Sequence, residues 1–124
     1  QWDDHEVMNN WHPGMPLGAD PRYGEKSLAL LAARARRAMF EYVPVRAAID
    51  EAERVYRSIS YGPRLELFVL DERSYRGPNN PNRQESVSEV TAMLGRAQLD
   101  WLKGALKASR ATWKVIASDM PIGL

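Results

Sequence analysis

Apolar and polar positions follow a helical period near the start of the chain. Between residues 26 and 42, apolar side chains recur every three or four positions, from Leu28 to Tyr42, while charged side chains lie between them. This spacing is typical of an amphipathic helix with one buried stripe. Ser27 is a suitable cap and Pro44 cannot continue a helix, so we expect a helix over 26–42.

The period then changes to that of β-strands. Residues 54–61 alternate between apolar and polar side chains, and Gly62 and Pro63 follow as a turn. The segment 65–71 is nearly continuously apolar until it ends at Asp71. The pattern predicts a β-hairpin, whose second arm is buried on both faces and carries a polar group to a site at its carboxyl end.

The rest of the chain predicts a long surface loop, a helix and a strand. Residues 73–84 are rich in asparagine and proline and have few apolar anchors. Helical spacing returns over 93–107, with Trp101 on the apolar stripe, and 112–118 is a short β-prone run. Helices that alternate with strands in this order predict a layered α/β fold.

Composition narrows the classes of function. The chain has 124 residues, a formal net charge of +1, 44% hydrophobic residues and no cysteine. Its length suits one structural unit, and balanced charge disfavours a dedicated nucleic-acid binder. No apolar run approaches the ~20 residues that cross a bilayer, and disulfides and thiolate metal sites are excluded.

The two ends of the sequence indicate a partial domain. The chain begins at Gln1 inside a polar cluster, without an initiator methionine, and stops just after an apolar run. We therefore expect residues 1–124 to be one unit that lacks both flanks of its domain.

The chemistry that the sequence offers is concentrated near its start. Carboxylate, amide and imidazole groups crowd the first twelve positions, at Asp3, Asp4, His5, Glu6, Asn9, Asn10 and His12. Oxygen ligands of this kind suit a hard cation or a phosphate-handling site. The same residue types also cap helices and shape turns, so composition alone leaves a purely structural loop open.

Five blocks, in the same order along almost the whole chain, resemble the PhoD-like alkaline phosphatases. They are WDDHEVMNNW (2–11), EYVPVR (41–46), FVLDERSYR (68–76), LGRAQLDWL (94–102) and WKVIASDMP (113–121). This family is part of the calcineurin-like metallophosphoesterase superfamily. The resemblance implies that the complete protein is a β-sandwich flanked by helices, with clustered metals at the ends of its strands.

The resemblance also assigns roles to the first block. Asp4-His5-Glu6 stands where the superfamily has an Asn-His-Asp/Glu motif, with Asp in place of Asn. By this likeness Asp4 is a metal ligand, and His5 is the catalytic residue that contacts the phosphate or the departing oxygen. Asn9 is a second candidate metal ligand, Asn10 is equally suited to shaping the loop, and Glu6 is expected to orient His5.

Three further residues are candidates for facing the phosphate. Asp71 and Arg73 follow the buried strand and can organise a loop there, although an Asp–Arg pair at a strand end is also a common structural feature. Arg76 has the forked donors of a phosphate clamp, but a solvated or ion-paired role stays open for it.

The implied enzyme is a secreted phosphatase or phosphodiesterase with a calcium and ferric iron centre. Its substrate is a phosphate ester, cleaved by a metal-activated hydroxide, and export uses a signal outside this segment. Other ligands of the centre would lie on earlier strands and on a later Asp-x-His segment, so we expect the fragment alone to be inactive. Oligomeric state and the choice between monoesters and diesters are left open.

Two functions of other classes compete with this interpretation. A small binding module whose polar loop holds a structural cation would bind calcium without turnover. A truncated interaction domain would expose the apolar stripes around Trp101 and Leu28 to a partner.

Overall fold

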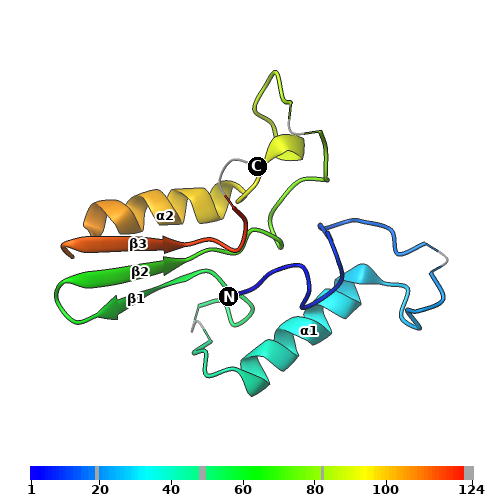
Figure 1. Cartoon of the computed structure of the whole chain (residues 1–124), viewed down its shortest axis with the longest axis horizontal. Coiled ribbons are helices and arrows are strands. Elements are labelled where there is room, and N and C mark those ends of the chain that lie inside the picture. Colours follow the sequence, from blue (N-terminus) through cyan, green and yellow to red (C-terminus); the bar gives the residue numbers. More distant parts are fainter. Residues whose placement is uncertain (19, 48–49, 82, 122–124) are drawn as a thin grey trace.

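The computed structural model describes residues 1–18, 20–47, 50–81 and 83–121, and in this part the chain forms a small mixed α/β fold (Figure 1). The elements, in chain order, are α1 (Leu28–Tyr42), β1 (Arg57–Tyr61), β2 (Leu65–Val69), a short 3₁₀ helix η1 (Glu89–Thr91), α2 (Arg96–Ala108) and β3 (Trp113–Ala117). The α/β class is therefore confirmed in the form of a small mixed α/β unit. The β-sandwich of a complete domain stays a prediction.

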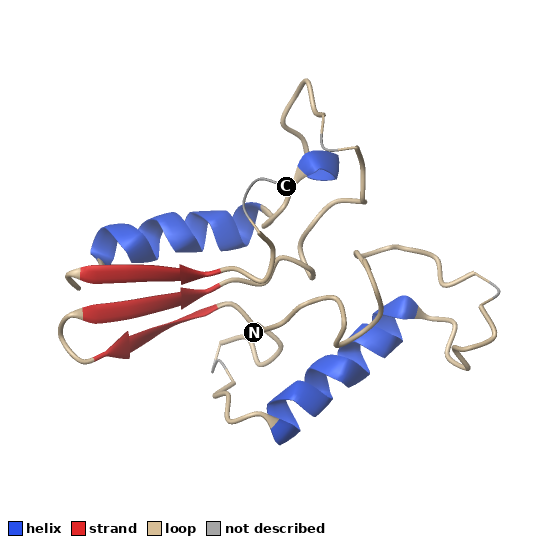
Figure 2. Ribbon diagram, viewed as in Figure 1, coloured by secondary structure: helices blue, strands red, loops and turns tan. Residues whose placement is uncertain are grey.

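The three strands form one sheet in the order β1-β2-β3, with β2 in the centre. β1 and β2 are antiparallel, as the predicted hairpin requires, and Ile59 lies opposite Leu67. β3 runs parallel to β2, so the chain must cross over between them, and α2 makes this crossover along one face of the sheet (Figure 2). Phe68 and Leu102 are in the small core between the sheet and α2.

A second core joins α1 to the first segment of the chain. Ser27 caps α1 by accepting a hydrogen bond from the Leu30 N–H at 3.3 Å. The buried side of α1 packs on the start of the chain and on Val55. The buried residues of this core are Trp2, Trp11, Leu17, Leu28, Ala32, Met39 and Val55. This core fixes residues 2–17 against α1, so the polar loop that they carry has a defined place.

The structure corrects several details of the predicted elements. The first arm of the hairpin begins at Arg57 instead of residue 54, and the second helix begins at Arg96 instead of residue 93. β2 is not buried throughout, because its first three residues are half-buried. Tyr42 was placed on the buried stripe of α1 but is 86% exposed, because it ends the helix beyond the core.

Two other expectations have mixed outcomes. The predicted loop 73–84 is irregular where it is described, and residue 82 lies outside the described part. The apolar stripes that a truncated interaction domain would expose are packed inside the molecule, since Leu28 is buried and Trp101 packs against the second core. Within the described ranges no helix has the length and apolarity that crossing a membrane requires.

Candidate functional site

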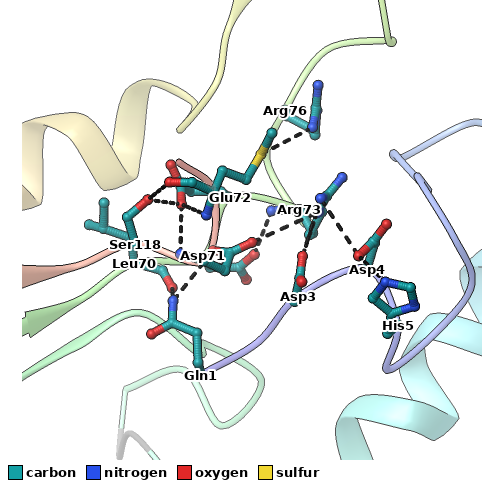
Figure 3. A network of polar contacts seen from close by, with 12 residues as sticks. Gln1, Asp3, Asp4, His5, Leu70, Asp71, Glu72, Arg73, Arg76 and Ser118 are labelled. Atoms are coloured by element: carbon teal, nitrogen blue, oxygen red, sulfur yellow. Dashed lines mark hydrogen bonds and ion pairs between the residues drawn. The ribbon is translucent and has the colours of Figure 1, made fainter. Parts of the chain in front are cut away.

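Three segments distant in the sequence meet at the carboxyl end of the parallel strands. The first residues of the chain run beside the end of β2, where Trp2 forms an isolated parallel bridge with Asp71. The Gln1 side-chain amide donates to the carbonyl of Leu70 at 3.2 Å. The segment after β3 completes the group, and Figure 3 shows the polar side chains of all three segments facing one another.

Asp71 is the structural centre of the turn after β2. It is 1% exposed, and its Oδ1 accepts hydrogen bonds from the backbone N–H groups of Arg73 and Ser74 at 3.1 and 2.8 Å. Asp71 thus fixes the backbone of the turn. Its carboxylate does not reach the surface, so a direct contact between Asp71 and a phosphate has no support from this geometry.

Gln98 on α2 holds the same turn from the side of the helix, and no role for it was predicted from the sequence. It is fully buried, its Oε1 accepts from the Asp71 N–H at 2.8 Å, and its Nε2 donates to the Asp71 carbonyl at 2.7 Å. The sequence did contain a signal for this role, because Gln98 is a polar residue four positions after Leu94, on the apolar side of a helix. Such a residue must find partners in the core.

Arg73 lies among three aspartates. Its side chain is 7% exposed, and its Nε and Nη2 donate to Asp3 Oδ1 at 3.2 and 3.1 Å. Its Nη2 is 3.7 Å from Asp4 Oδ1, and its Nε is 3.8 Å from Asp119 Oδ2. The guanidinium therefore joins the start of the chain to the segment after β3.

Asp4 and His5 are adjacent in space but differ in exposure. The Asp4 side chain is 5% exposed, its Oδ2 accepts from the Asn10 N–H at 2.6 Å, and its Oδ1 is 3.6 Å from His5 Nε2. Burial alone raises the pKa of Asp4, but the Asn10 N–H and the charge of Arg73 outweigh it, so the net pKa is lowered. The imidazole of His5 is 76% exposed. The pair thus offers a fixed carboxylate beside an accessible imidazole.

The other residues of the first loop have more structural contacts. Asn10 has a φ of 56° and its backbone N–H binds Asp4, which favours the loop-shaping role proposed for it. Glu6 accepts a hydrogen bond from the Asp3 N–H at 2.8 Å, so its contact is with the backbone; orientation of His5 by Glu6 stays a prediction. Asn9 is exposed, and its role as a metal ligand also stays a prediction.

Glu72 and Asp119 add two buried carboxylates for which the sequence predicted no role. Glu72 Oε2 accepts from the Ser118 hydroxyl at 2.6 Å and from the Asp119 N–H at 3.1 Å. Burial, reinforced by Glu72, raises the pKa of Asp119 to about 7. The sequence did contain a signal, because Asp119 lies just after β3 as Asp71 lies just after β2, and the carboxyl ends of parallel strands meet at one edge of the sheet.

Arg76 stands at the rim of the network without a carboxylate partner among the described residues. Its Nη1 lies 3.5 Å from Met120 Sδ, a weak acceptor, and its Nε is buried without a hydrogen bond. Burial lowers the pKa of Arg76, and the positive charge of Arg73 lowers it further. Its donors are therefore largely unused.

These carboxylates do not form a metal centre by themselves. Across the described ranges, no three side chains of histidine, cysteine, aspartate or glutamate are placed to hold one ion. Asp3, Asp4 and Asp119 instead surround a guanidinium. The described residues thus do not assemble by themselves the calcium and ferric iron centre that the family resemblance implies.

Comparison with known proteins decides the family. A family model described as "PhoD-like phosphatase" matches residues 1–124. The chain belongs to the PhoD-like phosphatase family. It is 32% identical to alkaline phosphatase D of Bacillus subtilis (strain 168), over 96% of this chain and 21% of that protein. The resemblance carried by the five sequence blocks is therefore confirmed.

The fold agrees with the same family. A solved structure described as "Structure of PhoD" matches with a TM-score of 0.70 and 32% identity, over 95% of this chain and 24% of that chain. The chain thus spans about a quarter or less of the length of these PhoD relatives, and the small α/β unit corresponds to one part of the PhoD structure.

Proposed function

We propose that the whole protein hydrolyses phosphate esters and that this chain contributes Asp4 and His5 to the reacting centre. Membership of a family of phosphatases supports the reaction class. The observation that carries the assignment of residues is the contrast between a carboxylate fixed in a buried network and an imidazole, 3.6 Å away, that is 76% exposed. Substrate can reach His5, while Asp4 is held behind it.

His5 is suited to protonating the leaving group. In ester hydrolysis the oxygen of water attacks phosphorus and loses a proton to the solvent, the bond to the ester oxygen breaks, and the departing alkoxide takes up a proton. A protonated His5 forms an ion pair with Asp4 and can give its proton to that oxygen. Asp4 stays ionised as His5 gains and loses its proton, because the Asn10 N–H and Arg73 keep the pKa of Asp4 low.

Arg76 is suited to binding the phosphoryl oxygens. It is the arginine of the network whose donors are not directed at a carboxylate in the described part of the chain. A guanidinium can donate two parallel hydrogen bonds to a phosphate, and a partly buried one does so with less competition from water. Asp71 supports this role by fixing the backbone of the turn that leads to Arg76.

Calcium and ferric iron belong to the proposal through the family alone. Because the described residues do not assemble a metal site, we assign no step to a metal. Asp4 and Asn9 as metal ligands rest on the family resemblance, and measurements of cation binding decide between a metal and Arg73 as the partner of Asp4. Secretion and the β-sandwich of the complete domain are likewise implied by the family. Monoesters and diesters are both suitable substrates.

The proposal is tested with this chain and with a longer product of its gene that spans the length of the relatives. Each is supplied with calcium and iron and assayed on p-nitrophenyl phosphate and its bis-ester. We expect hydrolysis by the longer product and none by the 124 residues alone. Hydrolysis by neither product would overturn the proposal, and cation binding without turnover would favour the structural-cation module.

Variants of the longer product separate the roles. We expect His5→Ala to lower kcat by about 10²- to 10⁴-fold on an alkyl phosphate, whose leaving group needs a proton, and by less on p-nitrophenyl phosphate. Asp4→Ala should lower both rates. His12→Ala is the matched control, because it removes the other histidine of the same loop. Equal losses on both substrates would contradict the role of His5 as an acid.

A further inference from the structure

The aspartates Asp3, Asp4 and Asp119 form a cluster, and the positive charge among them is the side chain of Arg73. Three carboxylates, from Asp3, Asp4 and Asp119, lie within 3.8 Å of nitrogens of the Arg73 guanidinium. Figure 3 shows that this guanidinium points from the turn after β2 toward the aspartates of the first segment. The Arg73 and Asp119 side chains are 7% and 2% exposed, so water does little to solvate either charge.

The geometry of the cluster suits a guanidinium better than an ion. An ion needs carboxylate oxygens that converge on one point at 2.0 to 2.6 Å, roughly the range for hard cations. Here the oxygens are distributed around a planar group, and two nitrogens of Arg73 share the same Asp3 oxygen. Buried carboxylates without a positive partner would be strongly destabilised, so Arg73 supplies the charge that allows them to lie together.

We propose that Arg73 takes the place of a metal ion in the cluster of Asp3, Asp4 and Asp119, and that it positions Asp4 beside His5. Arg73 is then a positioning residue and not a group that contacts phosphate, which replaces the role predicted for it from the sequence. The first half of the proposal concerns the chain alone. The second half rests on the proposed phosphatase function.

The contacts of Asp4 explain how the positioning works. One Asp4 oxygen is fixed by a hydrogen bond from the Asn10 N–H at 2.6 Å. The carboxylate can still rotate about this hydrogen bond unless its second oxygen is also held. The second oxygen faces Arg73 at 3.7 Å and His5 at 3.6 Å. Without Arg73, the three carboxylates would repel one another, and the Asp4 carboxylate would lose the group that holds its second oxygen near His5.

Substitution of Arg73 should create a cation site. In Arg73→Gln the positive charge is lost while the three aspartates remain, so we expect the chain to bind Tb³⁺ at least about tenfold more tightly than the wild type, measured by emission excited through its tryptophans. Ca²⁺ should compete with Tb³⁺. Arg73→Lys keeps the charge and should bind no better than the wild type. Arg37→Gln, which removes an exposed arginine paired with Glu41 on α1, is the matched control.

Two results would overturn this half of the proposal. One is a wild-type chain that already binds Tb³⁺ as tightly as Arg73→Gln, because the cluster would then have room for an ion beside the guanidinium. The other arises if Arg73→Gln does not fold. In that case the proposal requires that Arg73→Lys folds and is insensitive to Ca²⁺. A lysine variant that also fails to fold, or folds only with Ca²⁺, would show that a single positive charge is not what the cluster needs.

Kinetics of the longer product test the positioning of Asp4. We expect Arg73→Gln to lower kcat at least about tenfold with KM nearly unchanged, and Arg73→Lys to restore most of kcat. A rise in KM that lysine does not restore would instead show that Arg73 contacts the phosphate, and would overturn the positioning role. A longer product without any hydrolysis would count against the proposed function, whereas the Tb³⁺ measurements still decide what occupies the cluster.

Discussion

Asp119 connects the stability of the polar network to pH. Burial and the neighbouring Glu72 raise its pKa to about 7, whereas an aspartate in the unfolded chain titrates near 3.8. Between these values the folded state binds more protons than the unfolded state, so its stability falls as pH rises from about 4 to about 7. The contribution of Asp119 is complete below the unfolded pKa and is lost above the folded one.

We expect Asp119→Asn to remove this dependence, because asparagine does not ionise. The wild type should lose on the order of 1 to 3 kcal/mol of unfolding free energy more than the variant does between pH 4 and pH 8. Urea unfolding at both pH values measures the difference. Asp20→Asn is a suitable control, since the pKa of Asp20 is lowered to about 2 by Arg22 and lies below this range. An unchanged slope in Asp119→Asn would contradict the assignment.

For single residues, the sequence predicted which side chains lie in the site better than it predicted which side chains they contact. Asp4 and His5 were chosen from their motif, and the structure places them side by side. Arg73 was a candidate for facing a phosphate, with a structural role left open, and its partners Asp3 and Asp119 lie 70 residues before it and 46 residues after it. Contacts across such separations depend on how strands pair, and no local pattern in the sequence records them.

The start of α2 shows how an element is placed by a single residue. Gly95 caps this helix with a φ of 69°, and a Cβ on it would lie 2.9 Å from the Cβ of Tyr75. Gly104, inside the same helix, has open space where a Cβ would stand. An alanine is therefore unfavourable at Gly95 and favourable at Gly104, although the sequence presents both glycines as breaks in a helical pattern.

Replacement of each by alanine should shift stability in opposite directions. We expect Gly95→Ala to lower the unfolding free energy by about 1 to 3 kcal/mol, from the left-handed backbone and the contact with Tyr75 together. Gly104→Ala should raise it by about 0.5 to 1 kcal/mol, because alanine favours the helix. Urea midpoints of both variants test this pair. A tolerated alanine at Gly95 would mean that the turn before α2 can move away from Tyr75.

Periodicity predicted the elements but not their assembly. Both helices and the hairpin were expected from the spacing of their apolar residues, because the residues on the buried side of an element recur at the period of a helix or a strand. The parallel pairing of β2 with β3 could not be read in this way, since it joins residues 48 apart, such as Leu65 and Trp113. The crossover by α2 that brings Asp119 to Asp71 follows from that pairing.

The sheet as a whole has one covered face and one open face. Phe68 points toward α2, so its neighbours along β2 point to the other side. The strand registers place six apolar residues on that second face, in two rows: Ile59, Leu67 and Val115, then Tyr61, Leu65 and Trp113. Trp113 is 68% exposed and Tyr61 is 77% exposed. A continuous apolar face of this kind favours association in water.

We therefore expect the 124-residue chain to associate with itself as its concentration rises, through this face. The double variant Ile59→Thr and Val115→Thr keeps β-branched side chains in both strands but removes apolar surface, and should weaken association about tenfold. Val87→Thr is the matched control, because Val87 is fully exposed outside the sheet. Sedimentation velocity over a range of concentrations measures the change. If Val87→Thr weakened association as much as the double variant did, the contact would lie outside the sheet, and the open face would not be what drives association.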